Sequence, residues 1–395
     1  MRKFTFSLLA LAFISGCAAP ETKIEKSLLN DEYFRYTLSN GYFGVDVMPQ
    51  LGGRISGMRS IPEQREFFRE QRVSVEKDDL LPPVVRSNDT GITDYGWRKA
   101  LCLKPAAVES VSCDPEVSSI TMRDRYFRLL DCECVKKVSL RRQSSAMQVE
   151  ITLSNRAAEP LEFSLWQNVL PVMGGEGNGL DIVVIPAKGK TDGSGSRRVT
   201  FFERDTVFQE RDLAVQEIYV APVRPWIAVR GASRPGVLVL RVADELAGNG
   251  AFCYTWKNSR THTMEWIGKT MVIPPGGNHL FQLEYAYFPD MKNISDVFGK
   301  EVSSGVYAGI GEGKLRIEMQ SSGKVESAEW KFFLTSAGTD GRRIPVGTVI
   351  VPELLPGKLF SVEFALPSGI AAGEYFLSGS SGRDDFRIPE AFCVK

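Results

Sequence analysis

Hydrophobic and polar residues alternate along much of the chain with a period of two. In FRYTLSNGYFGVDVM, residues 34–38 alternate, Asn40-Gly41 marks a tight turn, and residues 43–47 alternate again. The same pattern recurs in MQVEITLSN at 147–155 and in LFQLEYAYFP at 280–289. A period of two with Asn-Gly between two such runs is typical of β-hairpins. The only candidate helix is a short one at 62–76, PEQREFFREQRVSVE.

The spacing of these segments predicts an all-β fold with two domains. DIVVIP and VLVLRV are apolar on both faces, which suits buried strands of a sandwich, and turns recur about every ten residues. A polar stretch follows Phe288, and short strands separated by Gly, Pro and Ser come after it. We therefore predict a larger β architecture over 31–292 and a small immunoglobulin-like β-sandwich over 300–395.

The first residues have a sequence pattern that predicts export. Arg2 and Lys3 precede an apolar run, and the sequence ISGC at 14–17 resembles a bacterial lipobox. We expect residues 1–16 to be a signal peptide, Cys17 to carry the lipid, and 17–30 to form a tether. No aspartate follows Cys17, which favours the outer membrane of the cell envelope, with the lipid as the only membrane anchor.

Composition excludes several classes of function. Lysine plus arginine equals aspartate plus glutamate, 48 against 48, with no long block of one sign, so we expect no nucleic-acid partner. Two histidines and irregularly spaced cysteines give no metal site, and no cofactor motif is present. The oligomeric state stays open, as does the disulfide pairing of Cys102, Cys113, Cys132, Cys134, Cys253 and Cys393.

The segment NSRTHTMEW holds the residues with acid and base chemistry. His262 and Glu265 could move a hydroxyl proton, and an aromatic ring beside them could stack on a sugar. On a strand, however, an odd separation puts 262 and 265 on opposite faces, so both reach one site only if a bulge or turn intervenes.

Three stretches resemble the galactose mutarotase-like, or aldose 1-epimerase-like, superfamily, and most of all its uncharacterised secreted bacterial members. They are LSNGYFGVDVMPQLGGRI at 38–55, PLEFSLWQNVLPV at 160–172 and MEWIGKTMVIPPGGNHLFQLEYAYFP at 264–289. The resemblance implies a β-supersandwich over 31–292, a bend at Gly52-Gly53, and Glu265 as the matching basic glutamate. Where the epimerases carry their proton-donating histidine, this chain has Trp166-Gln167-Asn168.

These observations favour a surface-anchored carbohydrate-binding or accessory lipoprotein with a glycan cleft. The residues that we expect to bind the ligand are Arg54, Asp94, Trp97, Trp166, Asn168 and Trp256, with Glu265 and His262 as candidate catalytic groups. One alternative is a carbohydrate-active enzyme, an aldose epimerase or a hydrolase or lyase, that uses Glu265 and His262. Another is a structural envelope lipoprotein, for which we expect the named residues to be scattered.

Overall fold

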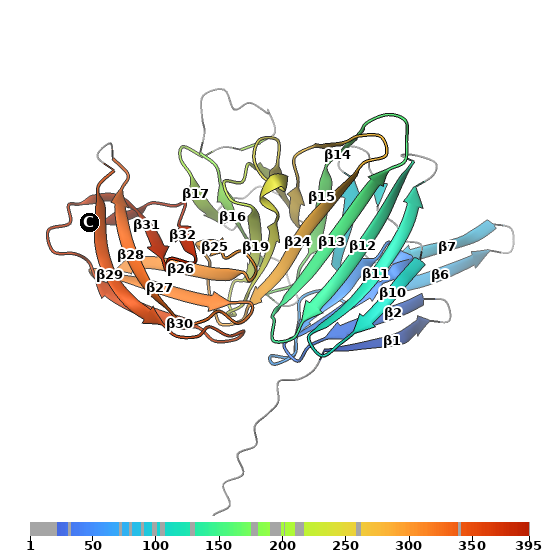
Figure 1. Ribbon diagram of the computed structural model, residues 1–395, viewed down its shortest axis with the longest axis horizontal. Helices are drawn as coiled ribbons and strands as arrows, with labels where there is room; N and C mark the ends of the chain where they lie inside the picture. The colour runs from blue at the N-terminus through green and yellow to red at the C-terminus, as the bar shows by residue number, and fades with distance from the viewer. Residues whose placement is uncertain are drawn as a thin grey trace, which may run out of the picture.

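A computed structural model gives the arrangement of the chain. It describes residues 22–30, 33–70, 73–78, 81–87, 91–96, 101–102, 107–126, 131–174, 181–189, 199–200, 202–209, 217–257, 262–338 and 341–394. The regular elements within them are strands and two short 3-10 turns, Pro49–Leu51 and Asp244–Leu246. The all-β prediction is therefore confirmed, and Figure 1 shows two stacks of sheets joined side by side.

The predicted helix at 62–76 is wrong. That stretch contains turns, strand β5 (Arg65–Glu66) and the start of β6 (Val73–Asp78), which pairs with β7 (Leu81–Ser87). β5 pairs with β4 (Arg54–Ser60), and the Phe67 amide donates to the Met58 carbonyl over 2.8 Å. Sheet neighbours thus satisfy the backbone groups that a helix would have bonded within itself.

The first large sheet counts eleven strands within the described ranges. Its main order is β1 (Lys23–Asn30), β2 (Tyr33–Ser39), β3 (Phe43–Met48), β4, β8 (Gly91–Gly96), β15 (Leu165–Leu170), β22 (Met264–Ile267), β21 (Phe252–Trp256) and β18 (Glu217–Val220). β5 and β9 (Leu101–Cys102) are attached to β4 and β8. Because its central strands come from distant parts of the chain, this sheet can gather side chains that are far apart in sequence.

The second large sheet has nine strands in the part of the chain that the structure describes. Their order is β10 (Ala107–Cys113), β11 (Val117–Tyr126), β12 (Cys132–Arg141), β13 (Ala146–Asn155), β24 (Asn278–Phe288), β20 (Val237–Val242), β19 (Trp226–Gly231), β16 (Asp181–Ala187) and β17 (Thr206–Gln209). A short pair, β14 (Leu161–Phe163) with β23 (Met271–Ile273), lies outside both large sheets. In Figure 1 strands β10 to β13 and β24 of this second sheet lie nearest the viewer.

The core fills the space between the two large sheets. Val45 and Val169 of the first sheet belong to the same buried cluster as Val149, Leu240 and Leu283 of the second. Alternate residues of each strand point into this cluster, and those between them point away from it. The first sheet therefore has an inner face toward the core and an outer face on the opposite side.

The tether prediction is wrong for residues 23–30. Residues 23–30 form β1, which pairs antiparallel with β2 and makes one edge of the first sheet. Its charged and polar residues suit an exposed edge strand, where lysines discourage pairing with other chains. The sequence of this segment resembles a linker because it lacks the apolar face of a central strand.

A smaller sandwich follows at the C-terminal end. One of its sheets has the order β25 (Asp296–Phe298), β26 (Ser304–Gly311), β27 (Lys314–Ser321) and β30 (Phe360–Ala365). The other has the order β29 (Arg343–Val351), β28 (Ala328–Ser336), β31 (Gly373–Ser380) and β32 (Asp385–Arg387), with β33 (Phe392–Val394) paired to β31. The sandwich begins at β25, in the interval 293–299 that the two predicted domain ranges left open.

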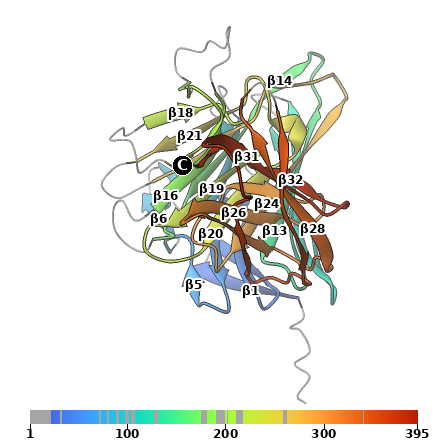
Figure 2. The ribbon, with the colours of Figure 1, turned by 90° about the vertical axis from the view of Figure 1, so that its left-hand side faces the viewer.

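The small sandwich packs against the large one through both backbone and side chains. Trp226 of β19 donates to Asp296 of β25 over 3.1 Å, and the Ser145 amide donates to the Ser322 carbonyl over 2.7 Å. Figure 2, seen from the C-terminal side, shows β26, β28 and β32 in front of β13, β20 and β24. Trp226 and Val239 of the second sheet form a buried cluster with Val297 of β25, so the contact covers part of the outer face of the second sheet.

Cysteines and membrane segments add little to this picture. Cys113, Cys132, Cys134, Cys253 and Cys393 are free thiols, and burial raises the pKa of Cys132 to about 11. Burial also raises the pKa of Cys134 and Cys253, so these three buried thiols stay protonated at neutral pH. Among the described residues, no helix has the length and apolar character that a membrane span requires.

Candidate functional site

Strand register places one row of side chains across the outer face of the first sheet. Thr93 of β8 pairs with Asn168 of β15, and Asn168 pairs with Glu265 of β22. Glu265 pairs with Tyr254 of β21, which in turn pairs with Tyr219 of β18. Residues directly opposite each other on paired strands point to the same face. These five side chains therefore form a continuous polar and aromatic row, which we call the outer row.

Glu265 is the ionisable group at the centre of the outer row. It is 2% exposed, and the Trp166 ring nitrogen donates to its carboxylate over 2.6 Å. Burial raises the pKa of Glu265 to about 7, although hydrogen bonds from the Thr263 and Trp166 side chains act in the opposite direction. A carboxyl group with this pKa can both accept and donate a proton at neutral pH.

Asn168 offers a hydrogen-bond acceptor next to Glu265. Its side-chain oxygen is buried and receives no hydrogen bond from any residue that the structure describes. A buried amide oxygen without a donor is unusual, because most such groups are satisfied. On this face it can accept a hydrogen bond from a hydroxyl group of a ligand that lies beside Glu265.

Aromatic rings continue the site on the other side of Glu265. The ring centroids of Tyr219 and Tyr254 are 4.6 Å apart, and those of Tyr219 and Phe252 are 5.7 Å apart. Burial also raises the pKa of Tyr254 above its usual range, so the phenol stays protonated. These rings form an apolar surface with polar tips, which is the chemistry that stacks on a sugar ring and bonds its hydroxyls.

Four of the predicted site residues share this outer face with Glu265. Trp166 contacts Glu265 directly, and Asn168 is its cross-strand neighbour. Trp256 lies two residues beyond Tyr254 on the same strand. Arg54 precedes Ile55, which pairs with Ile92, so the antiparallel register puts Arg54 opposite Thr93. The structure thus brings Arg54, Trp166, Asn168, Trp256 and Glu265 to one face.

Asp94 lies on the inner face, so its predicted role in ligand binding is not supported. It is 1% exposed, forms an ion pair with Lys136 of β12, and accepts a hydrogen bond from Gln167 over 2.7 Å. The Tyr285 hydroxyl donates to Gln167 over 2.7 Å. We call Asp94, Lys136, Gln167 and Tyr285 the interior network. Buried charges of this kind need a partner, and Lys136 of the opposite sheet provides it.

Gly52 and Gly53 serve the backbone. Their φ angles are 78° and 62°, in the left-handed region that favours glycine, so the expected bend is present. The Gly53 carbonyl accepts a hydrogen bond from Lys136 Nζ over 2.9 Å. The group that approaches these glycines is thus an interior lysine of the opposite sheet.

His262 does not share the face of Glu265. Its ring bonds to the Thr255 hydroxyl over 3.0 Å, and Thr255 is fully buried two residues from the core residue Cys253. Burial raises the pKa of Asp181 to about 6, and His262 acts on that pKa in the opposite direction. The register of β21 with β22 has no bulge, so the odd separation of 262 and 265 keeps them on opposite faces.

Two predicted residues, Trp97 and Cys17, lie outside the described residues. Sequence reasoning also missed Thr93, Tyr219, Tyr254 and Phe252. The alternation in FCYTW at 252–256 contained a signal for two of them, because it puts Phe252 and Tyr254 on the same face as Trp256. Thr93 and Tyr219 gave no comparable signal, since only strand pairing brings them to Glu265.

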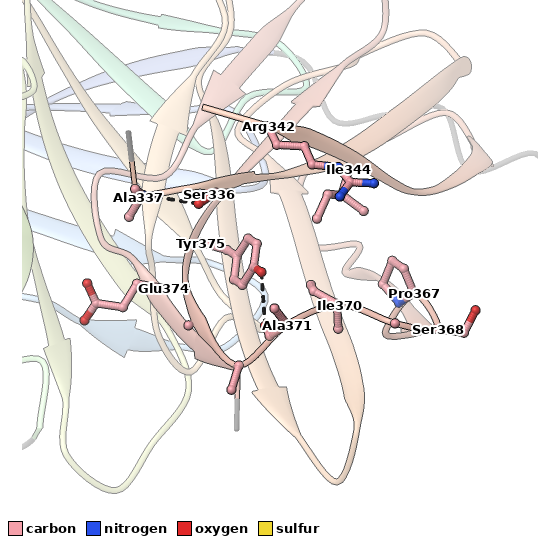
Figure 3. A pocket seen from close by; sticks show the side chains of 14 residues that line it. Ser336, Ala337, Arg342, Ile344, Pro367, Ser368, Ile370, Ala371, Glu374 and Tyr375 are labelled. Atoms are coloured by element: carbon pink, nitrogen blue, oxygen red, sulfur yellow. Dashed lines mark hydrogen bonds between the residues drawn. The ribbon is translucent and has the colours of Figure 1, made fainter. Parts of the chain in front are cut away.

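A different hollow lies on the small sandwich, as Figure 3 shows. The Tyr375 hydroxyl donates to the Ala371 carbonyl over 3.0 Å, beside Arg342 and Ile344. Most of its remaining lining consists of small residues in the segment 367–373. It lacks a carboxyl group with a pKa near neutrality, so the outer row is the better candidate. Within the described ranges, no group of three His, Cys, Asp or Glu side chains could hold a metal ion.

Comparisons with known proteins give structural likenesses at low sequence identity. No protein-family model matches the chain, and no curated protein matches it. A galactose mutarotase-like protein of Clostridium acetobutylicum is 10% identical over 68% of this chain and 98% of that chain, with a TM-score of 0.48. A TPR-domain-containing protein of Parabacteroides distasonis is 11% identical over 65% and 47%, with a TM-score of 0.44. A galactose mutarotase-like protein of Lactobacillus casei is 11% identical over 64% and 99%, with a TM-score of 0.42. The function has to be argued from the site itself.

Proposed function

We propose that the protein binds carbohydrate on the outer face of the first sheet, around Glu265. The observation that carries this proposal is the outer row, in which a buried carboxyl group lies between an amide and a set of aromatic rings. Carboxylate, amide and indole groups bond sugar hydroxyls, while tyrosine and phenylalanine rings pack on the C–H faces of the ring. The sequence resemblance to the galactose mutarotase-like superfamily agrees with this reading.

The same proposal includes the place of the protein in the cell. The lipobox-like sequence ending at Cys17 supports attachment to the cell envelope through a lipid on that residue, with the carbohydrate site held outside the cytoplasm. An anchored glycan-binding protein would hold polysaccharide at the cell surface for other proteins. The clustering of five predicted residues on one face favours this function over a purely structural lipoprotein.

An enzymatic function is the second candidate, and the pKa of Glu265 favours it. A carboxyl group with a pKa of about 7 can act as general base or general acid. Aldose epimerisation also needs a second proton carrier, and His262 faces away from Glu265. Tyr254, the protonated cross-strand neighbour of Glu265, is the group that could act as this second proton carrier.

A proton NMR titration of the mature chain, starting after Cys17, tests these functions in one tube. We would add mono- and oligosaccharides and follow line broadening, anomer exchange and new reducing ends. Broadening that is lost in Glu265→Gln supports binding, and faster anomer exchange or cleavage that is lost in Glu265→Gln supports the enzyme. Glu162→Gln, an exposed carboxylate on β14, is the control. If no saccharide of the panel showed line broadening, faster anomer exchange or cleavage, both functions would be contradicted.

A further inference from the structure

A separate hollow lies on the outer face of the first sheet, beyond the end of the outer row. Its cavity volume is about 260 Å³, and strands β3 and β4 together with residues 66–70 surround it. The residues that matter here are Asp46, Met48, Gly57, Glu66, Phe68 and Arg69. The segment 66–70 is held in place because the Phe67 amide donates to Met58 and the Val172 amide donates to the Phe67 carbonyl, each over 2.8 Å.

Strand register connects the hollow with the outer row. Met48 lines it and pairs with Arg54, and Arg54 lies opposite Thr93 of the outer row. From β22, which carries Glu265, to β3 the sheet has four strand spacings. At about 4.8 Å each, this is a distance of about 19 Å along one face. A single pyranose ring is much shorter than this path.

Glycines make room for charged groups at the floor of the hollow. A Cβ on Gly57 would lie 2.6 Å from Asp46 Oδ2, and a Cβ on Gly44 would lie 2.8 Å from Arg59 Nε. Asp46 accepts hydrogen bonds from Thr37 over 2.7 Å and from Arg59 over 3.3 Å. These contacts fix a carboxylate and a guanidinium group side by side on the outer face.

The charges around the hollow balance. Arg35 and Arg69 line the hollow together with three carboxylates, those of Asp46, Glu66 and Glu70. Arg59 lies outside the lining and balances the third carboxylate through its ion pair with Asp46. Fixed donors and acceptors of both signs suit a neutral ligand with many hydroxyl groups, because each hydroxyl can donate to a carboxylate and accept from a guanidinium group. Phe68 and Met48 also line the hollow, but they are only 3% and 0% exposed, so the groups that it offers to a ligand are mainly polar.

We propose that this hollow is a second sugar subsite, and that the ligand is a neutral oligosaccharide that extends from Glu265 to Glu66. This inference rests on the proposed carbohydrate-binding function and specifies its ligand by length and charge. A monosaccharide would fill the Glu265 end alone, so affinity should rise with chain length until the ligand reaches the hollow.

The test is isothermal titration calorimetry, which measures the affinity of the mature chain for cello-, xylo- and manno-oligosaccharides. Each series runs from the monosaccharide to the hexasaccharide. The double variant Glu66→Gln, Arg69→Ala changes two exposed side chains of the hollow and leaves the core intact. We expect it to weaken binding of the longest ligand about tenfold, or about 1.4 kcal/mol, and to leave binding of the monosaccharide unchanged. Glu162→Gln should bind the whole series as the natural chain does.

The outcomes separate this inference from the proposed function. Binding that is independent of ligand length, or a double variant that binds every length normally, overturns the second subsite while carbohydrate binding at Glu265 stands. A stronger response to an anionic oligosaccharide such as an oligogalacturonate overturns the neutral character of the ligand. Absence of binding by the natural chain at every length would overturn the proposed function together with the subsite.

Discussion

Two buried carboxyl groups on opposite faces of one sheet have different environments. Asp94 points inward and is paired with Lys136, while Glu265 points outward and receives hydrogen bonds from neutral groups, the Trp166 indole and the Thr263 hydroxyl. A cation partner offsets the penalty of burying a carboxylate, whereas neutral donors offset only part of it. Both carboxyl groups are buried, so the difference lies in the partner, which is a lysine for Asp94 and a set of neutral donors for Glu265.

The largest expected effect is the loss of the Asp94 partner. Lys136→Met leaves Asp94 buried without a cation, and we expect a loss of about 3–5 kcal/mol in the free energy of unfolding. Chemical denaturation measures it. Lys136→Met combined with Asp94→Asn should recover much of the loss. Lys137→Met, which changes an exposed lysine next in sequence, should alter stability by about 0.5 kcal/mol or less. Equal effects of the two lysine variants would contradict the interior network.

Glu265 should make stability fall as pH rises. Its pKa is about 7 in the folded chain against 4.5 for an ordinary glutamate, so the folded state binds the proton more tightly. The stabilisation is fully present below pH 4.5 and is lost as pH rises through 7. The difference, (7 − 4.5) × 1.36, is about 3 kcal/mol. Between pH 4 and pH 8, the free energy of unfolding of the natural chain should therefore fall by about 3 kcal/mol more than that of Glu265→Gln.

Urea unfolding at both pH values measures this difference. Asp181 and Asp296 also have raised pKa values, so each lowers stability over the same pH range in both chains and cancels in the comparison. If the free energy of unfolding of Glu265→Gln and of the natural chain changed equally between the two pH values, Glu265 would have an ordinary pKa.

Removal of the Tyr254 ring should weaken ligand binding without affecting the interior network. Tyr254→Ala takes away a half-buried ring of the outer face, and we expect about tenfold weaker binding, equivalent to about 1.4 kcal/mol. Isothermal titration with the best ligand of the NMR panel measures it. Phe34→Ala removes an exposed ring on β2 of the same sheet and is the control. Equal losses in the two variants would count against a site at the outer row.

The smallest expected effect is on the pKa of Glu265 itself. Trp166→Phe keeps a ring but removes the N–H that donates to the carboxylate, so the pKa of Glu265 should rise above its present value. Carbon-13 NMR of the labelled side-chain carboxyl group follows this titration. Trp256→Phe on the same face should leave the pKa where it is. An unchanged pKa in Trp166→Phe would mean that this hydrogen bond does not favour the ionised form.

The sequence predicted part of the difference between Asp94 and Glu265. It identified Glu265 and Asp94 as notable carboxylates, and it separated 262 from 265 by strand parity. It did not recognise that Asp94 faces inward, because alternation within GITDYG does not say which side of the strand meets the core. It missed Tyr254 for a different reason, because only the tryptophan of this strand, Trp256, was considered as a residue that stacks on a sugar.

The sequence by itself determined the all-β character, the positions of the strands with a clear period of two, and which residues of one strand share a face. These are local properties, because the period of two and the turn residues act over a few neighbours. Tertiary structure alone decided that Lys136, 42 residues from Asp94, neutralises it across the core. It also decided that Tyr219, Tyr254, Glu265, Asn168 and Thr93 form one row, and that Glu265 is buried enough to hold a proton near pH 7. Strand order, partner charge and solvent exposure depend on residues far apart in the chain, and they are fixed only when the two sheets pack.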